Sequence, residues 1–387
     1  MRIAMIGQKG MPARDGGVER HVHDLAVRLH KKNFDVTVYN RKWYSETPVS
    51  TIEGVQIVHI PTVHTKHFDT ILHTLFATIH AMYHGNDILH YHGVGPSLLS
   101  WIPRVFTPHI KVVTTFHSMD RKHEKWGWFA KFMLRLGEYT ACKFAHSLIA
   151  VSPTIEQYAR DVYDTKSHFI PNAVNVQAGL EKTDVLKKWN LKKENYIVMI
   201  SRLIPHKGAH YLVDAWKQLQ KQHSALIQDK KLVIVGDGYY TDEYVKNLKE
   251  KAKGIDSIVF TGFQNGDTLR TLHSQALFQV HPSDNEGLPI CVLEGMSFAR
   301  PILLSNIPEH RDINGDEEAL FQYGSVDDLK EKLVFFLSLT DAERKKKGLL
   351  NKKIIEKYYT WDTVAEKIEN LYQSHAVLQL QKNPAQA

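Results

Sequence analysis

The stretch IAMIGQKGMPARDGGVERHVHDLAVRL, residues 3–29, begins with a short apolar run, continues through a glycine-containing loop and ends with helical spacing. A run that is apolar throughout indicates a strand that is buried on both faces. In the helical part, apolar residues recur every three or four positions and form one stripe, which consists of Val18, Val22, Leu25, Ala26 and Leu29. The stretch therefore predicts a strand, a loop and a helix of an α/β domain built on a parallel sheet.

The same alternation of apolar runs and helical segments recurs along the chain. Residues 68–83 and 127–145 have the spacing of longer helices. The other predicted strands are Val36–Tyr39, Val55–Ile60, Asp87–His92, Lys111–His117, Leu148–Ser152, His168–Pro171, Tyr196–Ile200, Leu232–Val235, Ile258–Thr261, Leu277–His281 and Pro301–Leu304. This repetition predicts two doubly wound α/β domains in tandem, with ligands bound beyond the carboxyl ends of the strands.

The predicted domain junction lies where the alternation is interrupted. Residues 173–194 are polar and lack a clear strand, so we expect one domain over residues 1–172 and a second over 173–357. The charged helical tail is interrupted at Tyr358–Trp361, where Thr360 or Asp362 can cap a last helix. We therefore treat residues 358–387 as a separate C-terminal helix.

Composition excludes several classes of protein. The chain has 387 residues, of which 43% are hydrophobic and 24% charged, as in globular proteins rather than disordered ones. Cys142 and Cys291 are the only cysteines, which argues against a disulfide scaffold and fits a reducing compartment. We expect neither a signal peptide nor a membrane-spanning helix, because no apolar stretch has the required length, and we expect a cytoplasmic location.

Positive charge is concentrated in the first half of the chain. The formal net charge is +7, and residues 1–171 hold 20 Lys and Arg against 14 Asp and Glu, together with 16 of the 23 histidines. This balance suits an anionic partner such as a phosphate or a lipid head group. No nucleic-acid reading motif accompanies the charge, so we expect no nucleic-acid partner.

Adjacent glycines end the loop after the first predicted strand. Gly16 and Gly17 stand at a helix start, where backbone N–H groups can approach an anion closely. The spacing differs from the GxGxxG fingerprint, so a nicotinamide dinucleotide is disfavoured. The loop predicts contact with a phosphate or a sugar, and a plain tight turn is the alternative.

Two cations follow the first predicted strand of the second domain. Arg202 and Lys207 lie between that strand and a helical segment. A guanidinium and an ammonium together suit a diphosphate. By themselves, two cations in a loop can equally be solvated.

The most specific motif is DNEGLPICVLE, residues 284–294. Gly287 loosens the loop, and Pro289 suits the first turn of a helix. We therefore expect the backbone N–H groups of Leu288 and Ile290 to face a phosphate.

The same motif contains two carboxylates. Glu286 precedes the helix and Glu294 lies about one turn inside it, and both can accept hydrogen bonds from vicinal hydroxyls of a sugar or a ribose. The alternatives are that Glu286 only complements the helix dipole and that Glu294 faces solvent. The apolar neighbours of Glu294 argue against its full exposure.

The glutamates form an E-x7-E pair, and with the Gly16-Gly17 loop and the Arg202/Lys207 pair the chain resembles family 4 glycosyltransferases with the GT-B fold. The resemblance covers essentially the whole length, with the motifs in the expected order. The first half is similar to the subgroup with a rhamnosyltransferase-like N-terminal domain, on residues 8–19 and 117–127. One departure is Ser118-Met119, where relatives often have Gly and an aliphatic residue.

The resemblance implies an architecture. Two Rossmann-like domains would face each other across a cleft, the first binding the acceptor and the second a nucleotide sugar. Residues 170–172 match the segment that enters the interdomain hinge of the family. The final helix would cross back to pack on the first domain.

The resemblance also implies roles for individual residues. Arg202 and Lys207 would neutralise the donor diphosphate, Glu294 would hold the ribose hydroxyls and Glu286 the hydroxyls of the donor sugar. His117, at the end of a strand of the first domain, would reach the donor sugar. The remaining implied contacts are to the donor phosphate and the acceptor from Gly16 and Gly17, to the donor from Gly287, Leu288, Pro289 and Ile290, and to the acceptor or sugar from Asp120.

The implied activity is that of a retaining hexosyltransferase. It would move a hexose or deoxyhexose from a nucleotide diphosphate sugar to a glycan or lipid-linked saccharide in cell-surface polysaccharide synthesis. Cations and a helix N-terminus would stabilise the leaving group in place of a metal, so we expect no metal and no cofactor. The other histidines, including His90 and His92, look too dispersed for a metal site, and we assign them no role.

Aromatic and basic residues are mixed in residues 125–135, KWGWFAKFMLR. Such a helix can lie on an anionic membrane, which would add peripheral attachment to the inner face of the cytoplasmic membrane. It can also be a packed domain helix whose cations line the rim. We favour packing.

Other functions compete with glycosyl transfer. A GT-B enzyme can act as a nucleotide-sugar epimerase, but no acid/base set of carboxylates stands out. Phosphorolysis of the glucan type would need a longer chain and a pyridoxal lysine. A non-catalytic two-domain sugar-binding protein is the third reading, against which the paired cations and paired glutamates count.

Overall fold

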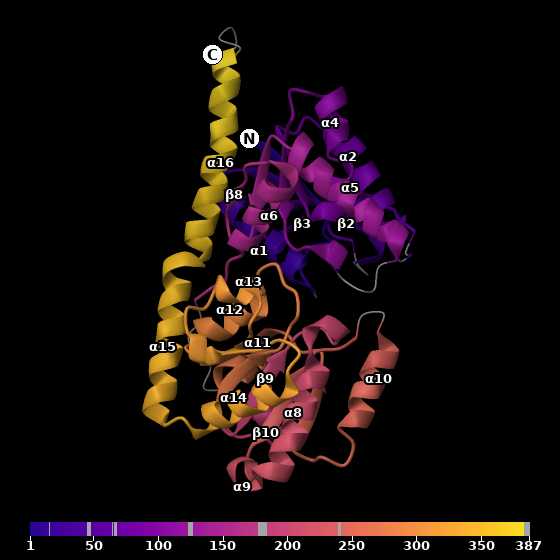
Figure 1. Ribbon diagram of the computed structural model, residues 1–387. Coiled ribbons are helices and arrows are strands. Elements are labelled where there is room, and N and C mark those ends of the chain that lie inside the picture. Colours follow the sequence, from indigo (N-terminus) through magenta and orange to yellow (C-terminus); the bar gives the residue numbers. More distant parts are fainter. Residues whose placement is uncertain are drawn as a thin grey trace. The chain divides into compact units, whose positions relative to one another are not determined.

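The computed structural model describes residues 1–382 except 15, 45–47, 64, 66–67, 123–126, 177–183 and 239–240. The chain forms two compact units (Figure 1). The first consists of Met1–Ala173 together with the chain from Trp361 onward, and the second is Val174–Thr360. The predicted junction at 173–194 falls partly on residues outside this description.

The first unit is built on an eight-stranded sheet of order β3-β4-β2-β1-β5-β6-β7-β8. Described pairs are parallel, apart from the antiparallel pair of β3 with β4. Its strands are β1 (Arg2–Ile6), β2 (Asp35–Arg41), β3 (Thr51–Ile52), β4 (Val55–Ile60), β5 (Ile88–His92), β6 (Lys111–Phe116), β7 (Ser147–Ala150) and β8 (His168–Phe169). Its helices are α1 (Gly17–Lys31), α2 (Phe68–Tyr83), α3 (Val94–Ser97), α4 (Trp101–Phe106), α5 (Trp128–Phe144), α6 (Pro153–Tyr163) and α16 (Trp361–Lys382).

The second unit has a six-stranded parallel sheet of order β11-β10-β9-β12-β13-β14. Its strands are β9 (Tyr196–Ile200), β10 (Lys231–Val235), β11 (Ile258–Gly262), β12 (Phe278–His281), β13 (Ile302–Ser305) and β14 (Leu320–Phe321). Its helices are α7 (Asp184–Lys187), α8 (Ala209–Gln222), α9 (Ser224–Ile227), α10 (Asp242–Lys251), α11 (Gly266–Ser274), α12 (Ile290–Ser297), α13 (Pro308–Arg311), α14 (Val326–Ser338) and α15 (Asp341–Tyr358). The prediction of two doubly wound α/β domains is thereby confirmed.

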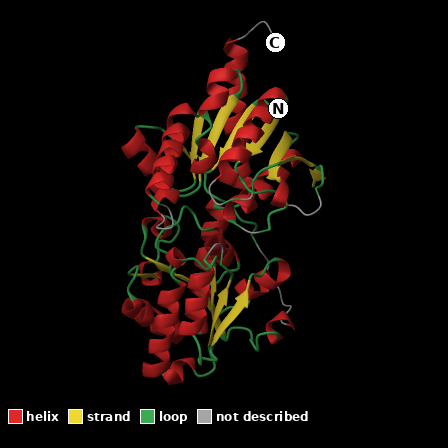
Figure 2. Cartoon of the chain, turned by 90° about the vertical axis from the view of Figure 1, so that its right-hand side faces the viewer, coloured by secondary structure: helices red, strands yellow, loops and turns green. Residues whose placement is uncertain are grey.

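Helices cover both faces of each sheet, as Figure 2 shows, and this explains the uninterrupted apolar runs. In β1, Ile3 and Met5 belong to a core shared with α1 and α16. The alternate residues Ala4 and Ile6 belong to a second core, shared with α2. Successive side chains of a strand point to opposite faces, so a strand between two helical layers needs apolar residues at every position.

Helix α16 closes the first unit, as expected for the final helix (Figure 1). Its apolar face joins the core around α1, through Trp361, Val364, Ile368, Leu371 and Tyr372. The hydroxyl of Tyr372 lies 2.6 Å from Nδ1 of the buried His90. Lys32, directly after α1, pairs with Glu369 at 2.5 Å. The C-terminal segment is therefore part of the first unit's core.

Two short strands, β3 and β14, were not predicted. β3 and β14 contain two residues each. Both lie at a sheet edge, where they extend a sheet that the longer strands already define.

The described part of the segment 125–135 begins α5, which packs on α3 as a domain helix, but the aromatic side chains of its first turns are exposed. On α5, Trp128 is 81% exposed, Phe129 60% and Phe132 53%. The packed side of α5 begins further along, where a Cβ on Gly137 would lie 2.2 Å from the carbonyl oxygen of Val94. Residues 123–126 lie outside the described residues. Within the described chain, no helix combines the length and hydrophobicity needed to cross a membrane.

Candidate functional site

Two loops at the carboxyl end of the second sheet are held together by backbone contacts. β9 and β12 are neighbours in the sheet, so the loops that follow them meet. The carbonyl oxygen of His206 accepts hydrogen bonds from Ser283 Oγ at 3.0 Å and from the Asp284 N–H at 2.9 Å. Gly208 has φ +73°, and a Cβ there would lie 2.0 Å from the Pro282 carbonyl oxygen. Only glycine permits this approach.

This junction brings Lys207 and Glu286 together. Glu286 Oε1 accepts from Lys207 Nζ at 2.5 Å and from His281 Nε2 at 2.7 Å. The Lys207 side chain is 13% exposed, Glu286 7% and His281 0%. Within the described part of the chain, Glu286 Oε2 makes no hydrogen bond, so this oxygen is available to a ligand hydroxyl.

The charged groups around Glu286 shift the pKa values of Glu286 and His281. Burial by itself would raise the pKa of Glu286, but the Lys207 ammonium and the His281 imidazole outweigh burial and hold the pKa well below its usual value. Burial by itself would lower the pKa of His281, but the Cys291 sulfur and the Glu286 carboxylate raise it to about 9. A fixed carboxylate between two cationic groups is the result.

The other predicted site residues of the second unit lie close to Lys207 or Glu286 in the sequence. Arg202 lies in the same loop as Lys207, with an exposed side chain. Leu288 is buried, and Pro289 stands at the N-cap of α12, so helical geometry begins at Ile290 rather than at the proline.

Glu294 lies in the second turn of α12 and is neither free nor fully exposed. Its side chain is 17% exposed, and Oε2 lies 3.8 Å from Nε2 of His273. The expectation that Glu294 avoids full exposure is therefore confirmed. Among the described residues, no hydrogen bond or ion pair joins Glu294 directly to Lys207 or Glu286.

In the first unit, the glycine loop already contacts a carboxylate. Gly16 has φ +93° and precedes α1. A Cβ at Gly16 would lie 2.1 Å from Glu19 Oε2, while Glu19 Oε1 accepts from the Lys9 N–H at 3.0 Å. Gly17 is the first residue of the helix and is exposed. The positive φ of Gly16 favours glycine, and the approach of the Glu19 carboxylate is a contact that the sequence did not predict.

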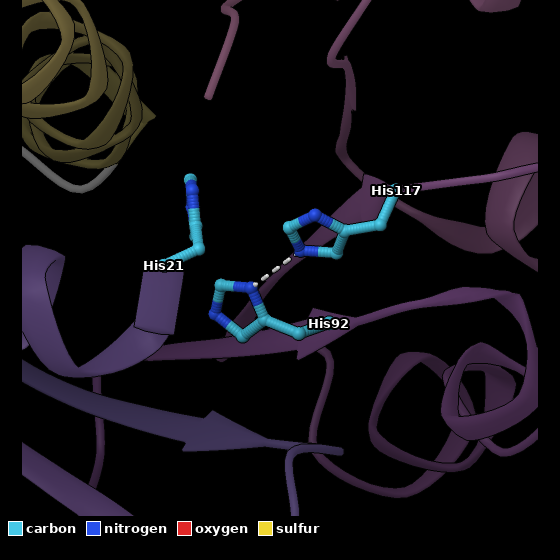
Figure 3. A group of neighbouring side chains, drawn as sticks. All are labelled: His21, His92 and His117. Carbon is cyan, nitrogen blue, oxygen red and sulfur yellow. Dashed lines mark hydrogen bonds between the residues drawn. The ribbon is translucent and has the colours of Figure 1, made fainter. Parts of the chain in front are cut away.

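His117 lies in a buried group of histidines rather than alone (Figure 3). His92 Nδ1 and His117 Nε2 are 3.2 Å apart, and the ring of His21 lies edge-on to His117 at 4.9 Å between centroids. The description of the histidines as too dispersed for a metal site is therefore wrong for these three. His90 stays outside the group of ligand atoms, bonded to Thr115 Oγ1 at 2.7 Å and to Tyr372.

Parallel pairing explains this group. His92 ends β5 and pairs in register with Thr115 of β6, two residues before His117. Neighbouring parallel strands end at the same edge of a sheet, so both imidazoles meet there. His21 lies on the buried side of α1, three residues after Val18 and four before Leu25. The signal was present in the sequence as strand-end histidines and a histidine in an apolar stripe.

Asp120 accepts a hydrogen bond from Ser118 Oγ at 2.7 Å. The neighbouring Arg121 is held by the buried Glu138, at 3.4 Å, and by the hydroxyl of Tyr158, at 2.8 Å. The segment after β6 is thus anchored from α5 and α6.

The two halves of the chain match two family models. The family described as Glycosyltransferase Family 4 matches residues 15–178, and the one described as Glycosyl transferases group 1 matches residues 181–361. A sucrose-phosphate synthase from Thermosynechococcus elongatus superposes with a TM-score of 0.83 at 21% identity, over 97% of this chain and 99% of that one. Fold and matches together define a glycosyltransferase with the GT-B fold.

Proteins similar in sequence to this chain are also named glycosyltransferases. A glycosyltransferase of Methanocaldococcus jannaschii is 26% identical over 96% of this chain and 98% of its own length. A UDP-Gal:α-D-GlcNAc-diphosphoundecaprenol α-1,3-galactosyltransferase of Escherichia coli is 28% identical over 57% of this chain and 58% of its own. Both family models and these relatives thus support a glycosyltransferase similar to family 4.

Proposed function

We propose that this protein is a retaining glycosyltransferase that moves a hexose or deoxyhexose from a nucleotide diphosphate sugar to a glycan or lipid-linked saccharide. The observation that carries the proposal is the Lys207–Glu286 pair at the carboxyl ends of β9 and β12. It combines a cation for a diphosphate with a carboxylate oxygen for sugar hydroxyls. Ligands of doubly wound sheets bind at this edge.

Each predicted donor contact has a chemical reason. Lys207 and the exposed Arg202 can offset charge on the diphosphate, and the backbone amides at the start of α12 add a positive helix end. Glu286 Oε2 can accept from a sugar hydroxyl while Oε1 stays bound to Lys207 and His281. Glu294, partly exposed on α12, suits the ribose hydroxyls.

The reaction needs a stabilised leaving group more than a protein nucleophile. The bond from the anomeric carbon to the diphosphate oxygen breaks, and a bond to the acceptor oxygen forms on the same face of the sugar. The acceptor proton passes to the departing phosphate. Lys207, Arg202 and the amides of α12 offset the charge that develops on the leaving group, which is why we expect turnover without a metal. We assign His117 to the donor sugar, as the resemblance implies.

A lipid-linked acceptor is supported by two observations. The name of the Escherichia coli relative specifies a diphosphoundecaprenol acceptor for that enzyme. In this chain, α5 exposes Trp128, Phe129 and Phe132 beside the cations Lys131 and Arg135. Exposed aromatic side chains with cations suit the interface of an anionic membrane. We therefore propose peripheral attachment at the cytoplasmic membrane face, in cell-surface polysaccharide synthesis.

A donor screen tests the proposal. The protein is incubated with UDP-, GDP- and dTDP-sugars, with and without a lipid-linked saccharide, and nucleoside diphosphate release and product configuration are measured. We expect release with one donor class and a product that keeps the donor's anomeric configuration. An isomerised nucleotide sugar without an acceptor product would indicate an epimerase, and binding of free sugar without release would indicate a sugar-binding protein.

A further inference from the structure

We propose that His21, His92 and His117 form a binding site for a divalent cation of the zinc type. Their ligand atoms all lie within 4.8 Å of one another. His92 Nδ1 and His117 Nε2 are 3.2 Å apart. Two imidazole nitrogens bound to one tetrahedral Zn²⁺ at about 2.0–2.1 Å are separated by about 3.3 Å. These two nitrogens share a hydrogen bond, drawn as a dashed line in Figure 3, and their separation is close to that of two ligands of one metal.

Zn²⁺ binds unprotonated imidazole nitrogens. His92 Nδ1 and His117 Nε2 share a hydrogen bond, so one of these two nitrogens carries a proton. A cation bound to both rings would replace this hydrogen bond, and the proton would move to the other nitrogen of its ring.

Buried ring nitrogens that lack a hydrogen-bond partner also favour a cation site. Both ring nitrogens of His21 are buried without a hydrogen bond of good geometry, although the Asn172 side chain interacts with this ring, and Nε2 of His92 is buried without a partner among the described residues. Buried polar atoms normally have partners, and leaving one unpaired costs about 1–3 kcal/mol. A cation that binds His21 would pair at least one of these atoms. Three histidines also leave a fourth position of a tetrahedral ion open for water or another oxygen ligand.

The rings are presented by rigid elements. His92 ends a central strand of the sheet, His117 follows the adjacent strand, and His21 belongs to the buried face of α1. His117 is the most accessible of the three, at 7% exposure against 2% for His21 and 1% for His92. A cation would reach the site past His117.

The second cluster of metal-binding residue types does not qualify. His281, Glu286 and His310 also place ligand atoms within 4.8 Å of one another. There, the carboxylate already pairs with Lys207 and His281, and His310 Nδ1 lies 2.8 Å from the Ser305 carbonyl. A metal would have to displace a cation that is in place.

The site has a consequence for activity that rests on the proposed function. His117 cannot serve a cation and a donor sugar with the same nitrogen. Zinc bound at this site therefore inhibits glycosyl transfer, and a chelator relieves the inhibition.

Binding is tested without substrate, so that its outcome is independent of the proposed activity. The full-length protein is titrated with Co²⁺, a spectroscopic substitute for Zn²⁺, and affinities are obtained by competition with Zn²⁺. We expect one equivalent with the intense visible absorption of tetrahedral Co²⁺. His21→Ala and His92→Ala should weaken binding by more than the roughly 10- to 100-fold that loss of an outer-shell partner costs.

His84→Ala is the matched control. His84 follows the end of α2, and its ring stacks on the ring of His80 with 3.7 Å between the centroids. The variant tests whether this pair of imidazoles binds the ion instead of the buried group. Retained binding in His84→Ala supports the buried site. Weak octahedral absorption, no binding, or loss only in His84→Ala overturns it.

Anomalous diffraction tests the site if the His21→Ala and His92→Ala variants do not fold. Crystals of the unaltered protein grown with Zn²⁺ are measured at the zinc absorption edge. A peak between the rings of His21, His92 and His117 supports the site. A peak elsewhere, or none, overturns it.

Discussion

Lys207 Nζ and Glu286 Oε1 lie 2.5 Å apart although 79 positions separate these residues in the sequence. The contact follows from sheet order, because β9 and β12 are neighbours and the His206 carbonyl binds the loop that begins after β12. The proposed cation for the diphosphate is thus oriented by the proposed acceptor of sugar hydroxyls. Substitution of either residue should therefore disturb the position of the other side chain.

Arg202→Ala and Lys207→Ala should both reduce turnover strongly. Removing a group that stabilises developing charge costs roughly 2–4 kcal/mol in the transition state. Only Lys207→Ala should also lower the free energy of unfolding, because it deprives the buried Glu286 of its cation, whereas Arg202 is exposed. Steady-state kinetics and urea unfolding measure the two effects. Lys246→Ala, on the exposed side of α10, is the control, and near-normal turnover in both site variants would refute the diphosphate assignment.

Activity should persist in excess chelator. The proposed stabilisation of the leaving group comes from Lys207, Arg202 and backbone amides, and none of these needs a metal. Turnover is compared with and without EDTA, and then after addition of Mg²⁺ or Mn²⁺. Loss of activity that either ion restores would contradict the proposed chemistry.

His281 should stabilise the protein in a pH-dependent way. Its pKa is about 9 in the folded protein against 6.5 in the unfolded chain, so its stabilisation is fully present below pH 6.5 and is lost as pH rises through 9. The unaltered protein should therefore lose stability relative to His281→Gln over this range, by at most about 3 kcal/mol. Urea unfolding of both proteins at pH 6.5 and 9.5 measures the difference. A difference that does not change with pH would mean that His281 is neutral.

The exposed face of α5 should bind anionic vesicles. Co-sedimentation with anionic vesicles should weaken as salt rises, because charges are screened within about 10 Å at 0.1 M. Lys131→Gln with Arg135→Gln should reduce binding, and Phe132→Ser should reduce it further at high salt, because burial of aromatic surface does not depend on charge. Lys246→Gln is the control. Equal partitioning to neutral and anionic vesicles, or none to either, would count against this surface.

Tyr372→Phe should lower the free energy of unfolding by about 1–3 kcal/mol, because it removes the partner of a buried ring nitrogen of His90. Trp361→Ala should cost about 3–5 kcal/mol, since Trp361 is 2% exposed in the same core. Chemical denaturation measures both. Stabilities close to that of the unaltered protein would mean that α16 contributes little to the first unit.

Much of the fold could be read from residue patterns. Apolar runs such as 196–200 predicted strands buried on both faces, and helices 68–83 and 127–145 appear as α2 and α5. These patterns are local: strand burial and helical periodicity are recorded in neighbouring residues. The exposure of the aromatic residues at the start of α5 was not predicted, because composition does not say which side of a helix has a partner.

The sequence determined the class of fold, the order of the motifs and the residue types of the donor site, because each of these lies in a short stretch of chain. Tertiary structure decided which side chains meet. Parallel pairing of β5 with β6 and of β9 with β12 brings His92 to His117 and Lys207 to Glu286. Strand order in a sheet is set by packing and chain crossovers over long sequence separations, and no local pattern records it.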